Sequence, residues 1–295
     1  MIVSVRVCGL TRLVALAWLA VLVTGCGLSV RQKAAIQRFA SSTSDFATVT
    51  STELVATRRD LIDMNTLRAE LGDEAVRPDR VDALFTVDRV RARVDAVAAL
   101  KAYGELLNVL ATSSQTAELK NAADGFVVSL RKVPGVGLSD EKAGAISTVV
   151  QAVGGLVVEY KRAEAVRDVV LATNQQVMAV VELVRRDFDP KADHWSLGYA
   201  VTIEGLRGAA ALAARGPDAA GRAALIGRAR VTAEQNQRRF ETISGEVAAS
   251  VLALREAQVN LRHVVQSRDI TVDEIQSYAA RVEDFVKIYR ILRAP

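Results

Sequence analysis

The sequence has few of the residue types on which catalysis and metal binding usually depend. Its 295 residues include two histidines, His194 and His263, and two cysteines, Cys8 and Cys26. It contains no HExxH motif, no phosphate-binding loop ending in Gly-Lys-Ser/Thr and no Gly-x-Ser-x-Gly motif. Two histidines on different predicted helices supply too few ligands for a zinc site. We therefore expect no enzyme, no metal and no cofactor, and no small-molecule substrate is evident.

Aromatic residues and proline are also scarce. Aromatic residues make up 5% of the chain and there are five prolines, whereas half of all residues are apolar. Ala, Val and Leu dominate, and such small and aliphatic side chains favour long packed helices over a sheet sandwich. The composition predicts an all-α fold.

The charge balance lacks a surplus of one sign. The chain has 38 basic and 34 acidic residues, and removing the segment before Cys26 also removes Arg6 and Arg12, which leaves 36 basic residues. A nearly neutral chain has no electrostatic footprint for nucleic acid, because such binding depends on a concentrated basic surface. We expect no nucleic-acid partner.

The N-terminus has the order of a secretory signal. Arg6 and Arg12 precede an uninterrupted apolar run from Leu13 to Val23, and no acidic residue occurs before Asp45. The run has about 11 residues, whereas a membrane-spanning helix needs roughly 20. A cleaved signal is therefore the better interpretation than a permanent transmembrane helix.

The residues Val23-Thr24-Gly25-Cys26 end this run and resemble the lipobox of bacterial lipoproteins. The resemblance implies cleavage between Gly25 and Cys26 and lipidation of Cys26, with residues 1–25 as the signal peptide. The alternative is a signal cut by the general peptidase with an ordinary cysteine just beyond it. Gly27 is similar to the residue found there in lipoproteins sorted to the outer membrane. This resemblance implies a lipid anchor in the inner leaflet of that membrane, facing the periplasm.

Residues 26–295 are predicted to form a single elongated domain of long helices. Turn and capping signals place helices at about 29–72, 79–132, 139–189, 193–215, 226–264 and 271–292. Helices this long, joined by short turns, predict an antiparallel bundle with coiled-coil-like packing. Because the first helix begins a few residues after Cys26, the bundle should stand close to the membrane surface.

The predicted helix at 226–264 has the clearest pattern, with steps of three and four residues that define a coiled-coil seam. The seam residues are Ile226, Ala229, Ala233, Asn236, Phe240, Ile243, Val247, Ser250, Leu254, Ala257, Leu261 and Val264. The pattern places Phe240 in the bundle interior and its neighbour Arg239 outside, so that Arg239→Ala should hardly change stability.

The segment 126–158 allows two interpretations. Ala143 to Val158 carries no charge, and it follows an apolar turn at 133–138. Such a hairpin could enter a bilayer, but Ser147, Thr148 and Gln151 interrupt it, and it is short of about 20 apolar residues. We prefer a helix enclosed on all sides by the others.

Three cations follow the proposed anchor. Arg31, Lys33 and Arg38 have no acidic residue near them in sequence, and each could contribute up to about 1 kcal/mol against anionic headgroups. We interpret them as contacts with the membrane surface.

These observations predict a lipid-anchored, periplasm-facing scaffold that is not an enzyme and binds another envelope protein. One alternative is a membrane-active protein resembling the α-helical pore-forming proteins in architecture, with 126–158 as its inserting hairpin. Another alternative is an envelope hydrolase, which no motif in the sequence supports.

Overall fold

The computed structural model describes residues 27–72, 74–77, 81–82, 85–153, 159–189, 195–266 and 273–293. Within these ranges the chain forms eight helices and no strand, so the fold is all-α as the composition predicts. The helices are α2 (Val30–Leu71), α3 (Val87–Thr112), α4 (Thr116–Arg131), α5 (Asp140–Val153), α6 (Glu159–Phe188), α7 (Trp195–Ala213), α8 (Ala223–Gln266) and α9 (Asp273–Arg293).

The boundaries of α2 follow from its terminal residues, as predicted. The Ser29 hydroxyl accepts a hydrogen bond from the Gln32 backbone N–H, and the Gln32 side chain accepts one from the Ser29 N–H. This capping box satisfies two of the N–H groups that a helix leaves unpaired at its start. Gly72 follows the last helical residue, and its N–H returns to carbonyls of the final turn.

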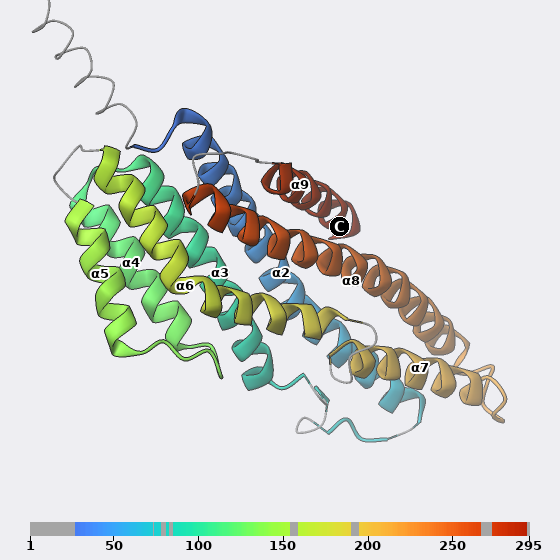
Figure 1. Cartoon of the computed structure of the whole chain (residues 1–295). Helices are drawn as coiled ribbons and strands as arrows, with labels where there is room; N and C mark the ends of the chain where they lie inside the picture. The colour runs from blue at the N-terminus through green and yellow to red at the C-terminus, as the bar shows by residue number, and fades with distance from the viewer. Residues whose placement is uncertain are drawn as a thin grey trace, which may run out of the picture.

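Two long antiparallel helices, α2 and α8, span the bundle (Figure 1). At one end the Gln32 side chain donates to the carbonyl of Val264, 3.1 Å away. At the other end the Arg222 guanidinium donates to the carbonyl of Leu71 at 2.8 Å. With 42 and 44 residues, the two helices are each about 65 Å long at 1.5 Å per residue. We call these the near end, where α2 begins, and the far end, where α2 stops.

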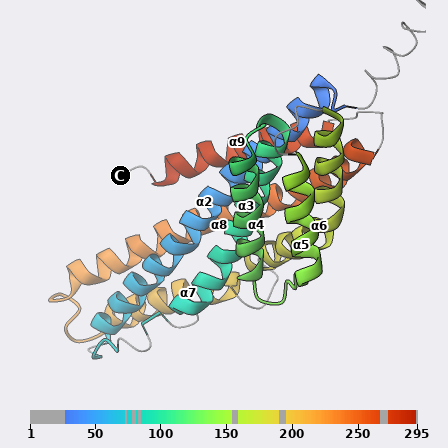
Figure 2. The ribbon, with the colours of Figure 1, turned by 90° about the vertical axis from the view of Figure 1, so that its left-hand side faces the viewer.

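The remaining helices surround this pair unevenly. Helices α6 and α7 follow one another along α8, so that α7 packs on α2 and α8 towards the far end (Figures 1 and 2). Helix α9 packs on α2 and α8 towards the near end, where Phe39 lies 5.8 Å from Tyr278 between ring centroids. The bundle is thus broader at the near end than at the far end, where α7 is the helix that packs on α2 and α8 (Figure 1).

The seam of α8 is confirmed almost completely. Eleven of its twelve predicted residues are buried, and Phe240 is half-buried against the Tyr199 ring, with centroids 4.5 Å apart. The placement of Arg239 outside the bundle is wrong. Its side chain is 17% exposed and forms an ion pair with Asp60 of α2. A long guanidinium can lie beside the seam when a carboxylate on a neighbouring helix meets it.

The predicted helix at 79–132 is instead two helices, α3 and α4, which pack against each other. Thr86 caps α3, and Ser113 ends it with extended backbone angles. From α6, the Arg162 guanidinium donates to the carbonyls of Ala111 and Ser113 at 3.2 and 3.3 Å. These bonds satisfy carbonyls that a helix leaves unpaired at its end.

The predicted helix at 139–189 is also two helices, because α5 ends at Val153 and α6 begins at Glu159. The two pack side by side, which one continuous rod could not do (Figure 1). The sequence between them, which contains Gly154 and Gly155, lies outside the described residues. The single helix predicted at 139–189 is therefore replaced by a pair of packed helices, α5 and α6, at the side of the bundle.

Close approach of α2 and α3 depends on one glycine. A Cβ at Gly104 would lie 2.7 Å from the carbonyl oxygen of Ala40, closer than side-chain carbons come to backbone. Beside this contact Tyr103 is fully buried, and its hydroxyl meets the Gln258 side chain of α8 at 3.2 Å. Burial raises the pKa of the Tyr103 phenol well above its ordinary value of 10.

Candidate functional site

The near end is the part of the bundle where the sequence places the membrane. Gly25 and Cys26, the proposed cleavage and lipidation residues, lie outside the described residues, so both assignments stay predictions. The chain is described from Gly27, and α2 begins at Val30. Four residues can span at most about 14 Å, so that Val30 lies within this distance of Cys26.

The three predicted membrane-contact residues do not share one face of α2. Arg31 and Arg38 are seven residues apart and therefore lie nearly in line along the helix, whereas Lys33 is rotated by about 200° from Arg31. Arg31 and Arg38 are exposed and line a common surface groove. Lys33 does not line it, is partly buried and has an interaction of its own.

The groove lies between the first turns of α2 and the start of α9 and has a volume of about 520 Å³. We call it the α2–α9 groove. Its lining residues are Arg31, Ala34, Ala35, Gln37, Arg38, Ile275 and Gln276. Sequence reasoning found the two arginines but not the groove, because Ile275 and Gln276 come from the opposite end of the chain.

Most large apolar side chains in the described part of the segment 126–158 point inward, although Val128 is 52% exposed. Phe126 is fully buried, and Val133 and Val136 in the turn between α4 and α5 are buried too. Gly135 occupies this turn with φ +77°, a conformation that glycine adopts without strain. In this turn Pro134 and Gly135 are exposed, whereas both valines are buried.

Helix α5 is not enclosed on all sides, which corrects the preferred interpretation of this helix. It packs against α4 and α6 at the edge of the bundle (Figures 1 and 2). The buried residues among those with described side chains form one face, namely Ala143, Ile146, Val150 and Val153. The opposite face exposes Gly144, Ala145 and Thr148, which are small or polar. Small residues without charge can thus cover a solvent-facing side of a helix.

No described constellation resembles a metal or membrane-spanning site. His194 lies outside the described residues, and His263 is exposed near the end of α8 and has an interaction of its own. The described part of the chain holds no group of three His, Cys, Asp or Glu side chains arranged for a metal ion. Across the same residues, no helix is sufficiently long and apolar to traverse a bilayer.

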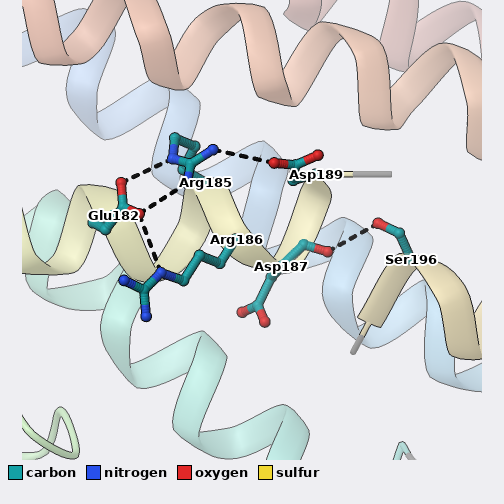
Figure 3. A network of polar contacts seen from close by, with 6 residues as sticks. All are labelled: Glu182, Arg185, Arg186, Asp187, Asp189 and Ser196. Atoms are coloured by element: carbon teal, nitrogen blue, oxygen red, sulfur yellow. Dashed lines mark hydrogen bonds and ion pairs between the residues drawn. The ribbon is translucent and has the colours of Figure 1, made fainter. Parts of the chain in front are cut away.

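A network of linked charges lies where α6 ends (Figure 3). Arg185 reaches Glu182 at 2.8 and 2.9 Å and Asp189 at 3.1 Å, and Arg186 also reaches Glu182, at 3.1 Å. The Arg185 hydrogen bonds lower the pKa of Glu182 to about 2. The network is paired throughout and close to solvent, which is typical of a structural ion-pair network rather than of a proton-transferring pair.

A small pocket lies beside this network. Arg93 of α3 pairs with Asp187 at 2.8 Å and stacks over the Trp195 ring, 4.5 Å from its centroid. The apolar part of the pocket is formed by α2, α3, α6 and the turn at Pro134, and the pocket has a volume of about 150 Å³. The Arg93–Asp187 pair therefore holds the end of α6 against α3.

Three basic residues of α8, Arg228, Arg238 and Arg239, each pair with a different carboxylate. Arg228 pairs with Glu70 at 3.0 Å and Arg238 with Glu234 at 2.8 Å. Comparisons of the chain with protein families, with curated proteins and with solved structures each give no match.

Proposed function

We propose that the chain is a lipid-anchored scaffold of the bacterial cell envelope, attached through Cys26 and facing the periplasm. The observation that carries this proposal is the continuity between anchor and rod. A helix of 42 residues begins four residues after the proposed lipidation residue, and its capped start leaves little flexible chain between them. The other end of such a helix lies about 63 Å from its start.

The bundle is suited to hold a partner at a set distance from a surface. Helices α2 and α8 are tied together at both ends by Gln32 and Arg222, so the far end cannot swing independently of the near end. Two or three acyl chains on Cys26 would hold the near end on the membrane essentially permanently, since each buried CH₂ contributes about 0.8 kcal/mol. A partner bound at the far end would therefore be kept in the periplasm, away from the bilayer.

Burial of most large apolar side chains in the described part of the 126–158 segment supports the scaffold over the inserting hairpin. Insertion would require Phe126, Val133, Val136 and Ile146 to leave the core, and each is buried among other helices. Exposing a buried Val, Ile or Phe side chain costs about 1.5 to 3 kcal/mol. Release of these four side chains through water would therefore be opposed by about 6 to 12 kcal/mol before contact with lipid could compensate.

The anchor is tested by metabolic labelling with a palmitate analogue. Cys26→Ser should abolish labelling and leave an unprocessed precursor, because lipoprotein processing acts on the lipidated cysteine. Cys8→Ser is the matched control, since Cys8 lies in the predicted signal, and it should leave labelling unchanged. Undiminished labelling of Cys26→Ser would overturn the anchor and, with it, the proposed function.

The upright rod is tested by photo-crosslinking in intact cells. A photoreactive amino acid replaces Val30 at the near end or Leu212 near the end of α7, where the side chains are 85% and 71% exposed. We expect lipid adducts from position 30 and protein adducts from position 212. Equal lipid labelling at both positions would mean that the body lies flat on the membrane, and the scaffold proposal would then be wrong.

A further inference from the structure

The α2–α9 groove unites positive charge, an apolar floor and a position beside the proposed anchor. Arg31 and Arg38 lie at its two ends along α2, and Ala34, Ala35 and Ile275 lie between them. Among the residues that the structure describes, neither arginine has a carboxylate or hydrogen-bond partner. This contrasts with Arg93, Arg185 and Arg239 elsewhere in the bundle, which are all paired.

Both charged side chains that line the groove are basic. The first turn of α2 contains no acidic residue, so the partial positive charge at the start of this long helix is not neutralised. The first turn of α9 does carry Asp273 and Glu274, which stabilise the start of their own helix, but neither lines the groove. The amide side chains of Gln37 and Gln276 add neutral hydrogen-bond donors to the lining.

We propose that the α2–α9 groove binds the phosphate of an anionic phospholipid headgroup, with Arg31 and Arg38 as the phosphate ligands. Arginine suits this task because its planar guanidinium can donate two parallel hydrogen bonds to phosphate. The alanines and Ile275 provide an apolar floor for the glycerol and the first methylenes of the lipid. Lys33, which faces away from the groove, takes no part in it.

The proposal rests on the proposed function, since a lipid anchor at Cys26 is what brings a headgroup to the groove. Arg31 is five residues from Cys26, so the two lie within about 18 Å at full extension. The occupant is therefore a lipid of the same leaflet. A headgroup held there would also fix the rotation of the bundle about its anchor, which acyl chains alone leave free.

The test is calorimetric titration of the lipidated mature protein in neutral detergent. The probes are dihexanoyl phosphatidylglycerol, dihexanoyl phosphatidylcholine and inorganic phosphate. We expect saturable binding of the phosphatidylglycerol and much weaker binding of the other two. Arg31→Gln and Arg38→Gln should each weaken this binding about five-fold, the equivalent of roughly 1 kcal/mol per cation near an anionic surface.

Two variants with the same loss of charge serve as matched controls. Lys33→Gln lies on the same helix turn as Arg31 but outside the groove, and Arg262→Gln removes an exposed cation at the near end of α8. Both should bind the phosphatidylglycerol like the unmodified protein. Glutamine is a good helix former, and unchanged helical circular dichroism would confirm that all four variants are folded.

Three results would overturn the proposal. Absence of saturable phosphatidylglycerol binding would exclude the site, and equal weakening by Lys33→Gln or Arg262→Gln would show a diffuse charge effect. Inorganic phosphate binding as tightly as the lipid would assign the groove to a free anion. Palmitate labelling of Arg31→Gln and Arg38→Gln should stay normal, so that loss of headgroup binding can be separated from failure of the anchor.

Discussion

Arg239 of α8 forms an ion pair with Asp60 of α2, and the two side chains are 17% and 16% exposed. The same guanidinium donates to the Asn236 side-chain oxygen at 2.8 Å and to the Tyr199 hydroxyl at 3.3 Å. Three helices, α2, α7 and α8, are thus joined by one side chain in the narrow half of the bundle. A pair this deeply buried should contribute to stability more than a surface pair does, provided that both partners are present.

Removal of Arg239 should therefore destabilise the protein. Arg239→Ala leaves the Asp60 carboxylate buried without its cation, and we expect the free energy of unfolding to fall by about 2 to 4 kcal/mol. Arg238→Ala is the control, because Arg238 is 78% exposed and its pair with Glu234 should contribute less than about 1 kcal/mol. Equal losses in denaturant unfolding would show that the Arg239–Asp60 pair does not bear on stability.

The contact at Gly104 should make this position intolerant of the smallest side chain. Gly104→Ala forces a carbon against the Ala40 carbonyl, and the two helices must separate, at a cost of about 1 to 3 kcal/mol. Gly125→Ala offers the opposite case, since a Cβ there meets no atom within 4 Å. That variant should gain about 0.5 to 1 kcal/mol from helix propensity. Thermal unfolding of both variants measures the contrast, and a stabilised Gly104→Ala would contradict the packing of α2 on α3.

The register of α8 can be tested with two leucines two residues apart. Leu254 is fully buried and Leu252 is half exposed. Leu254→Ala should cost about 3 to 5 kcal/mol, and Leu252→Ala less than about 1 kcal/mol. Chemical denaturation measures the loss of stability in both variants. A larger loss for Leu252→Ala would require α8 to be rotated about its axis.

The network at the end of α6 predicts an unusual acid titration. The pKa of Glu182 is lowered to about 2, mainly by its hydrogen bonds to Arg185. A lowered pKa means that the carboxylate stabilises the fold above its ordinary pKa of 4.5 and that this contribution is lost as the pH falls through about 2. The effect on stability should be small, because the Glu182 side chain is 40% exposed and solvent screens its ion pairs.

Carbon NMR of the glutamate carboxyl groups measures this titration directly. In Arg185→Gln the midpoint for Glu182 should rise towards its ordinary value, since the principal hydrogen-bond donor is gone. An unchanged Glu182 midpoint in Arg185→Gln would assign the lowered pKa to another cause.

Much of the fold could be predicted from local sequence. The seam of α8 was predictable because most of its residues are small or apolar and lie three or four positions apart. The start of α2 was predictable from Ser29, and its end from Gly72. These signals depend on the helix itself and on the presence of a buried face, not on which helix covers that face.

The wrong or incomplete predictions concern residues whose surroundings come from distant segments of the chain. Arg239 pairs with a residue 179 positions away, and no local pattern shows whether a carboxylate will be within its reach. The lack of charge in α5 from Ala143 onward indicated enclosure, but small residues cover its solvent side equally well. The spacing of Arg31 and Arg38 was visible in the sequence. The groove was not, because Ile275 and Gln276 of the distant helix α9 form its other side.

The antiparallel pairing of α2 and α8 has a mechanical consequence. Consider tension applied between the start of α2, at the near end, and the start of α8, at the far end. The two helices would then be pulled past each other along their common axis, and the interlocked side chains between them would have to slip together. Loading in this shear direction spreads the force over the whole interface rather than over one contact at a time. The same pair of helices pulled apart at one end would open sequentially under a much smaller force.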